Sequence, residues 1–149
     1  MQIGPYEIHH IDAGRYKLDG GAMFGVVPKT LWQKSNPADE KNRIEMALNT
    51  LLLVGDGRII LIDCGVGTKF SEKFQEIYAI DHSDRSLLRS LSEKNIQPED
   101  VTDVIITHLH FDHAGGSTCT DENGEIRLQF PGAMHYIQKK QLDWSSKKF

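Results

Sequence analysis

The chain has 149 residues, 39% of them hydrophobic and 26% charged, an ordinary composition for one globular domain with a real core. Its formal net charge is −4 at pH 7 and its lysines and arginines form no dense basic group, which argues against a nucleic-acid partner. No apolar run approaches the roughly 20 residues that cross a bilayer, and no signal peptide is recognisable, so we expect a cytoplasmic protein without membrane contact.

The first third of the chain predicts strand, glycine-rich and polar segments in turn. Residues 3–19 alternate loosely between apolar and polar side chains, which indicates an edge strand or hairpin. Residues 19–32 begin with Asp-Gly-Gly-Ala-Met-Phe-Gly, a flexible stretch followed by an apolar patch. Met23 and Phe24 in this stretch can either pack in the core or contact a substrate. Residues 33–43 are polar and predict an exposed excursion.

The middle of the chain predicts buried strands. Residues 44–62 predict central strands. Within them, the aliphatic run 51–62 suggests two short buried strands joined at Gly55-Asp56-Gly57, where glycine adopts positive φ at little cost. Cys64 and Cys119 are the two cysteines, and they lack the spacing of a metal-binding pair. We therefore expect reduced thiols, with Cys64 buried beside Asp63.

Two helices are expected after these strands, at about residues 68–78 and 83–94. Ser83 or Asp84 is a suitable N-cap for the second helix, and its leucines lie on one face. Asn95 is predicted to end this helix in a left-handed conformation.

The most informative segment is 107–116, which follows a predicted strand over residues 103–107. It contains three imidazoles and one carboxylate, from His108, His110, Asp112 and His113. Alternate residues of an extended stretch point the same way, so the first two histidines can bind one metal ion. After a turn, the aspartate and the last histidine can face a second one. The segment therefore predicts a binuclear centre, with zinc as the default and manganese or iron also acceptable. The alternative is a polar loop of surface histidines.

The remaining residues predict a turn, two strands and a helix. Gly115-Gly116 should let the backbone turn tightly after the metal loop. Strands are expected at 125–129 and 133–138, and a helix begins near Gln141. His135 is the last histidine of the chain and is expected to pack or lie on the surface rather than bind metal.

The pattern His-x-His-x-Asp-His after a hydrophobic strand resembles that of the metallo-β-lactamase-fold hydrolases. The run Leu61-Ile62-Asp63-Cys64-Gly65 is similar to a second family motif, and the resemblance implies that Asp63 orients the metal ligands through hydrogen bonds. Capping of the following turn is an alternative or additional role for Asp63. The segment from Asp19 to Trp32 resembles the branch with quorum-quenching lactonases and methyl-parathion-hydrolase-like enzymes, in which it lies beside the mouth of the active site.

The resemblance implies an α/β fold with a mixed sheet flanked by helices, namely the N-terminal αβ half of a four-layer αβ/βα sandwich. In this family a second half adds a third histidine for the first metal, an aspartate that bridges both metals, and a last histidine. We therefore expect residues 1–149 to form one metallo-β-lactamase-like domain that lacks this second half. A C-terminal half or a homodimer would have to complete the site, because two ligands per metal bind weakly.

The implied function is hydrolysis of an ester-like bond by a hydroxide held between two divalent metal ions. The implied metal ligands are His108, His110, Asp112 and His113. Asp112 would also take or give a proton as the catalytic residue. Met23, Phe24 and Phe111 are candidate contacts for a small-molecule substrate, although Phe111 can instead anchor the loop.

Several substrate classes are compatible with this resemblance. A lactone is favoured, because of the glycine-rich segment near the N-terminus. A glyoxalase-II-like thioester is second and an organophosphate third, whereas a β-lactam or RNA is less favoured. His110 argues against the diiron oxidoreductases of this fold, which have glutamate there. The alternative outside enzymology is an inactive fragment or an interaction module with an incomplete metal site.

Overall fold

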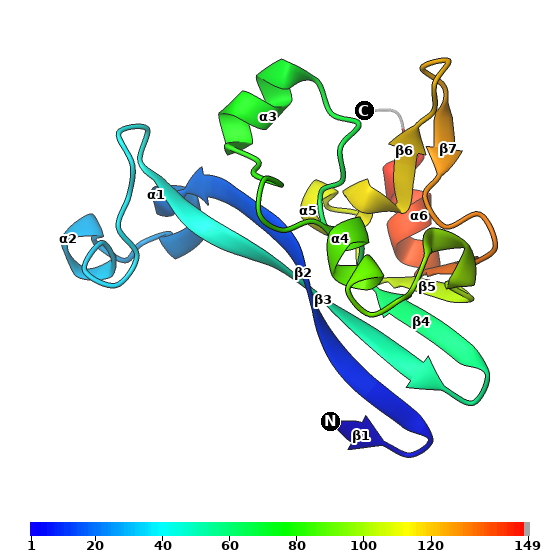
Figure 1. Ribbon diagram of the computed structural model, residues 1–149. Coiled ribbons are helices and arrows are strands. Elements are labelled where there is room, and N and C mark those ends of the chain that lie inside the picture. Colours follow the sequence, from blue (N-terminus) through cyan, green and yellow to red (C-terminus); the bar gives the residue numbers. More distant parts are fainter. Residues whose placement is uncertain (148–149) are drawn as a thin grey trace.

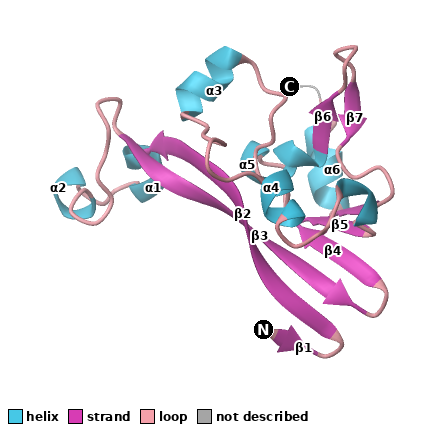
Figure 2. Cartoon of the chain, viewed as in Figure 1, coloured by secondary structure: helices cyan, strands magenta, loops and turns pink. Residues whose placement is uncertain are grey.

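The computed structural model describes residues 1–147, and a mixed sheet forms its centre. Within this range the sheet has six strands in the order β1-β2-β3-β4-β5-β8, and β6 and β7 form a separate hairpin. The strands are β1 (Gln2–Ile3), β2 (Tyr6–Asp19), β3 (Arg43–Gly55), β4 (Arg58–Ile62), β5 (Asp103–Ile106), β6 (Thr118–Thr120), β7 (Ile126–Leu128) and β8 (Met134–Ile137). The first four strands pair antiparallel, whereas β4, β5 and β8 pair parallel. Figure 2 shows helices on the flanks of these strands, so the expected mixed sheet with helices is confirmed.

The helices are short. They are α1 (Gly20–Phe24), α2 (Lys29–Trp32), α3 (Glu72–Tyr78), α4 (Leu87–Ser92), α5 (Phe111–Ala114) and α6 (Lys139–Ser145), with the 3-10 turns η1 (Pro98–Asp100) and η2 (Gly115–Ser117). None of the helices in residues 1–147 has the length and apolar character needed to cross a membrane.

A long twisted ribbon of β2 and β3 runs through the molecule (Figure 1). The prediction of short strands was wrong for β3, which has 13 residues. The predicted turn into β4 is confirmed, because Asp56 and Gly57 have φ values of 50° and 69°, and two positive φ values suit a tight hairpin. Among the described strands, only the two-residue β1 pairs with the outer side of β2. β2 therefore lies close to the edge of the sheet, where the sequence predicted it.

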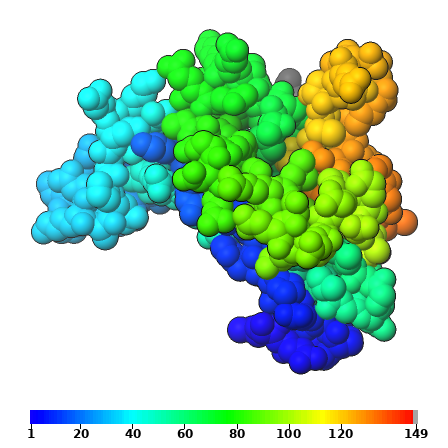
Figure 3. Space-filling view, viewed as in Figure 1, coloured from blue at the N-terminus to red at the C-terminus, as the bar shows by residue number. Residues whose placement is uncertain are grey.

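The outer end of the ribbon carries α1 and α2, and it protrudes from the body of the molecule (Figure 3). The expected flexible stretch is instead folded around an aromatic pair, Phe24 and Trp32, whose stacked rings have centroids 5.0 Å apart. Gly20 leaves room for this arrangement, because a Cβ atom there would lie 2.4 Å from the Trp32 ring.

The core lies on one face of the sheet, beneath α4. Leu52, Leu61 and Val104 are fully buried on this face, and Leu87 and Leu91 of α4 pack over them. Burial of such side chains contributes about 1.5–3 kcal/mol each.

Both helices expected between β4 and β5 are present but shorter than predicted. The N-cap of α4 is Ser86, which accepts a hydrogen bond from the Arg89 N–H, rather than Ser83 or Asp84. Asn95 adopts the predicted left-handed conformation with φ 58°.

The opposite face of the sheet is apolar and partly open. Leu51 of β3, Ile105 of β5 and Tyr136 of β8 are 44%, 37% and 46% exposed.

Candidate metal centre

The predicted metal loop begins where β5 ends, at the carboxyl edge of the parallel strands. Sites of α/β proteins commonly occupy this edge. Residues 107–110 lie between β5 and the short helix α5, and His110, in extended backbone, is the N-cap of this helix. The change from extended chain to helix separates the first two histidines from Asp112 and His113.

The four candidate donors form two pairs. Nε2 of His108 lies 3.1 Å from Nδ1 of His110, and Nε2 of His113 lies 3.4 Å from Oδ2 of Asp112. Two donors at 2.0–2.1 Å from one tetrahedral zinc are about 3.3 Å apart. Each pair therefore has the chemistry and spacing of two ligands of one metal ion.

Neither pair is a complete site. Within residues 1–147, no group of three or more His, Cys, Asp or Glu residues is arranged to hold one metal ion. A catalytic zinc has three protein ligands in addition to water. The described residues thus give two pairs of possible ligands, and the binuclear centre stays a prediction.

Asp63 lies beside this loop, at the end of β4. Its backbone has φ 62°, a left-handed conformation that costs a non-glycine residue free energy and is enriched at functional sites. The carboxylate accepts hydrogen bonds from the Thr107 N–H at 2.9 Å and from Nδ1 of His113 at 2.8 Å. Asp63 thereby connects the strand end to the second donor pair.

The Asp63 carboxylate also determines which histidine nitrogens are free. It can only accept hydrogen bonds, so Nδ1 of His113 carries the proton and Nε2 keeps its lone pair. Oγ1 of Thr107 lies 2.8 Å from Oδ2 of Asp63 and donates its single proton there. Oγ1 then accepts from Nδ1 of His108, 3.1 Å away. Both histidines therefore present an unprotonated Nε2, the form that metals bind.

Electrostatics favour the same state of the loop. Burial, followed by the imidazoles of His113 and His110, lowers the pKa of His108. A neutral imidazole is required for metal binding. Burial and the charge of Asp63 raise the pKa of the Cys64 thiol to about 12, so this thiol stays protonated.

The Asp63 segment and the metal loop touch through their backbones. The Cys64 N–H donates to the carbonyl oxygen of His113 at 2.7 Å. A Cβ atom at Gly116 would lie 2.1 Å from the Cys64 carbonyl oxygen. The expected turn is present as η2, but Gly115 has φ −57°, so the glycine pair is needed for close approach rather than for left-handed backbone.

Tyr16 of β2 reaches the same loop, and the sequence analysis did not single it out. Its hydroxyl donates to Oδ2 of Asp112 at 2.8 Å, and the side chain is almost fully buried. Burial raises the pKa of Tyr16 well above its usual value, and the hydrogen bond to Asp112 and the negative charge of Asp112 raise it further. Thr107 was also missed, although its position directly before the loop was a usable signal.

Phe111 anchors the loop in an aromatic cluster. Its ring contacts Tyr16, Phe74 and Tyr78 at centroid distances of 5.8, 5.2 and 4.6 Å. Met23 and Phe24 are not brought to the loop in the same way, because α1 lies at the outer end of the ribbon, apart from α5 (Figure 1). The structure thus shows the anchoring contacts of Phe111.

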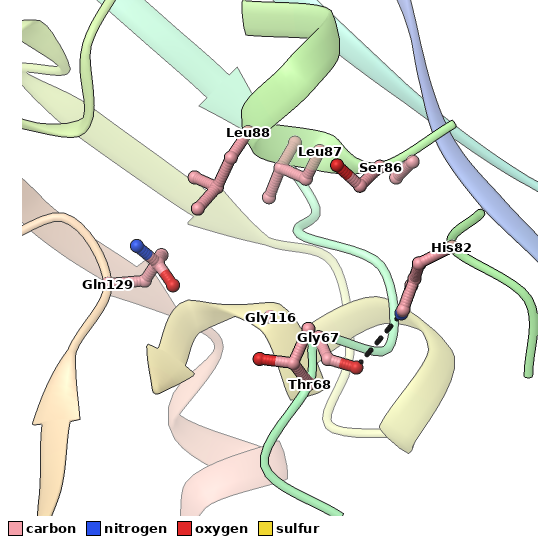
Figure 4. A pocket seen from close by; sticks show the side chains of 9 residues that line it. Gly67, Thr68, His82, Ser86, Leu87, Leu88, Gly116 and Gln129 are labelled. Carbon is pink, nitrogen blue, oxygen red and sulfur yellow. Dashed lines mark hydrogen bonds between the residues drawn. The ribbon is translucent and has the colours of Figure 1, made fainter. Parts of the chain in front are cut away.

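A cavity near the loop contains none of the four candidate ligands (Figure 4). It is lined by Ala13, Gly67, Thr68, His82, Ser86, Leu87, Leu88, Gly116 and Gln129. Nε2 of His82 faces the Gly67 carbonyl oxygen at 3.1 Å, and its buried Nδ1 has no hydrogen-bond partner among the described residues. His82 is therefore partly buried rather than the surface residue that its position before a helix suggests.

Comparisons with known proteins identify the family and the fold of the chain. The family model of the metallo-beta-lactamase superfamily matches residues 44–118. A solved structure described as a probable metal-dependent hydrolase from Staphylococcus aureus is 39% identical, with a TM-score of 0.82 over 96% of this chain and 50% of that chain. AidC, a dizinc quorum-quenching lactonase, is 26% identical, with a TM-score of 0.70 over 99% of this chain and 47% of that chain.

A further solved structure, the hydrolase AbOPH of the beta-lactamase superfamily, shares the fold at 23% identity with a TM-score of 0.71, over 99% of this chain and 46% of that chain. No curated protein matches the chain significantly. The chain spans about half the length of the solved structures that it matches.

Proposed function

Because the chain belongs to the metallo-β-lactamase superfamily, we propose that it forms half of the active site of a metal-dependent hydrolase that cleaves an ester-like bond. The observation that carries this proposal is the pair of half-sites. Two donor pairs lie at one strand end, each at the spacing of two ligands of one metal ion. Surface histidines without a function do not require a carboxylate and a threonine to set their tautomers.

His108 and His110 would hold one metal ion, and Asp112 and His113 the other. When bound, two such ions lower the pKa of water and polarise the substrate's reacting oxygen. The three histidines fix geometry and do no acid–base work, because each uses its free lone pair as a ligand. Asp112 would take and return a proton during the reaction. Zinc is the proposed metal, and manganese or iron accepts the same ligands.

A lactone is the proposed substrate class. It is supported by the 26% identity to AidC, which is a lactonase, and by the segment from Asp19 to Trp32. A thioester and an organophosphate are the alternatives, since the same pair of metal ions serves any electrophilic carbonyl or phosphoryl centre.

Met23, Phe24 and Phe111 remain proposed substrate contacts. For Phe111 this requires that one edge of the ring stays accessible while the other side packs in the aromatic cluster. For Met23 and Phe24 it requires that the substrate, or the part of the site outside this chain, reaches the end of the ribbon.

We propose that the site is completed by a second half of the protein or by a second copy of this chain. Native mass spectrometry after incubation with zinc and removal of the excess tests this. Two metal ions per chain, or four per dimer, support a site completed within this material. A metal-free or heterogeneous species would contradict metal binding by this chain alone and would favour the alternative of an inactive fragment or interaction module.

Activity is tested with a panel of lactones, thioesters and organophosphates on the metal-loaded protein. His110→Ala removes a ligand from the first half-site and should abolish turnover while leaving the fold intact. The matched control is His10→Ala, an exposed histidine of β2 that contacts Asn49. Full activity of His110→Ala would contradict the proposed function.

A further inference from the structure

Tyr16 owes its position to a β-bulge in β2. Pairing of β2 with β3 shifts register between Asp12 and Arg15. Ala13 and Tyr16 are both buried although they are three residues apart, which simple alternation along a strand does not allow. Ala13 and Gly14 together lie opposite a single residue of β3, and Gly14 has φ 118°. The bulge therefore turns Tyr16 toward the metal loop, and bulges are used in this way next to active sites.

The contact between Tyr16 and Asp112 has a defined direction. A phenol keeps its proton at neutral pH, and a carboxylate only accepts. The hydroxyl thus donates to Oδ2 of Asp112 over 2.8 Å. The same oxygen lies 3.4 Å from Nε2 of His113. A carboxylate oxygen has two lone pairs, so one can accept from Tyr16 while the other stays available.

The second half-site is thus supported from two sides. His113 is held by Asp63 at Nδ1, and Asp112 is held by Tyr16. Phe111, directly before Asp112, packs edge-on against the Tyr16 ring at 5.8 Å. This packing fixes the backbone of α5, and the hydroxyl fixes the rotation of the carboxylate.

We infer that Tyr16 is a positioning residue, whose hydroxyl orients the Asp112 carboxylate for the second metal ion. The inference rests on the proposed function, since it assigns a role to a residue that supports that site. Partners of metal ligands typically change metal affinity 10- to 100-fold when they are removed. Tyr16→Phe should therefore weaken the second metal at least about tenfold, which corresponds to about 1.4 kcal/mol.

The test is zinc affinity of the chain, measured by competition with a chromogenic chelator, in a double-mutant cycle. The variants are Tyr16→Phe, Asp112→Asn and the double variant. If the hydroxyl acts through Asp112, Tyr16→Phe weakens binding in the wild-type background but adds nothing to Asp112→Asn. A merely structural role gives the same loss in both backgrounds.

The matched control is Tyr78→Phe, which also removes a hydroxyl from a ring packed against Phe111. It should leave zinc affinity unchanged. Thermal unfolding midpoints check that both variants fold. If Tyr16→Phe does not fold, fluorotyrosine at position 16 keeps the shape and alters the donor strength, and an unchanged affinity then contradicts the inference.

The outcomes separate the two proposals. If the wild-type chain binds no zinc, alone or as a dimer, the proposed half-sites fail in this chain. If it binds zinc and Tyr16→Phe binds equally well, or if the losses add, only the role of Tyr16 is overturned.

Discussion

Replacing Asp63 with asparagine changes the chemistry of the loop without changing its backbone. Asparagine tolerates left-handed φ about as well as aspartate does, so the φ of 62° is retained. The side chain then offers one carbonyl oxygen and one NH₂ group instead of two acceptors. If the amide oxygen keeps the hydrogen bond from the Thr107 N–H, the NH₂ group faces the protonated Nδ1 of His113. Both groups are then donors, so no hydrogen bond forms between them.

His113 is expected to respond by moving its proton from Nδ1 to Nε2. The protonated Nε2 cannot bind a metal ion, so the second half-site loses a ligand. We expect zinc affinity to fall 10- to 100-fold, the usual effect of losing such a partner. The free energy of unfolding should fall by about 1–3 kcal/mol, because a part-buried hydrogen bond to a charged group is lost.

Two measurements check this reasoning. Nitrogen-15 NMR of the His113 ring reports which nitrogen carries the proton, and chelator competition reports zinc affinity. Asp103→Asn is the matched control, since Asp103 is another buried aspartate of the sheet but contacts Arg58 and Thr102 at the start of β5. An Asp63→Asn variant that keeps its proton on Nδ1 and its full zinc affinity would refute the argument.

Two further predictions concern the loop contact and acid stability. Gly116→Ala should destabilise the protein by about 1–3 kcal/mol or more, because its Cβ would lie 2.1 Å from the Cys64 carbonyl oxygen. Urea unfolding measures this loss, with Gly132→Ala as the control, because a Cβ at Gly132 would lie an ordinary 3.5 Å from Glu99. Equal unfolding midpoints of the two variants would contradict the prediction. The hydrogen bond from Arg58 lowers the pKa of Asp103 to about 2, below the unfolded value near 3.9. The ionised Asp103 therefore stabilises the protein fully above about pH 4, and this stabilisation is lost as the pH falls toward 2. Between pH 5 and 2 the unfolding free energy should fall less steeply for Asp103→Asn than for the wild type, and parallel curves of the two proteins would disprove this role.

The sequence predicted the positions of most strands, because the signals for strands and turns are local, whereas metal binding by the loop stays a prediction. The aliphatic runs of β3 and β4, the turn at Asp56-Gly57 and the left-handed Asn95 all depend on residues that are close in sequence. The helices between β4 and β5 were predicted too long, because the residues on either side of α3 and before α4 make caps and bridges to β2 instead of helical turns. The isolated bridge between Arg15 and Asp81 is one such contact.

Contacts between distant segments could not be predicted. Tyr16 and Asp112 are 96 positions apart, and the β-bulge that precedes Tyr16 has no strong local signal in the sequence. The requirement for Gly116 likewise depends on the approach of Cys64, which the local pattern does not reveal. Met23 and Phe24 were predicted to lie near the active site from the family resemblance alone, because no local pattern shows which distant segments they approach.

The hydrogen bonds around Asp63 also decide when the metal loop loses its freedom. Ordering a flexible backbone costs about 1–2 kcal/mol per residue, and a metal ion that had to collect its ligands from a mobile loop would bear that cost on binding. Here the Thr107 N–H, the His113 ring and the Cys64 N–H are held by hydrogen bonds between protein groups of two loops. The entropy of the loop is therefore lost during folding, and an arriving ion meets donors that are already in place.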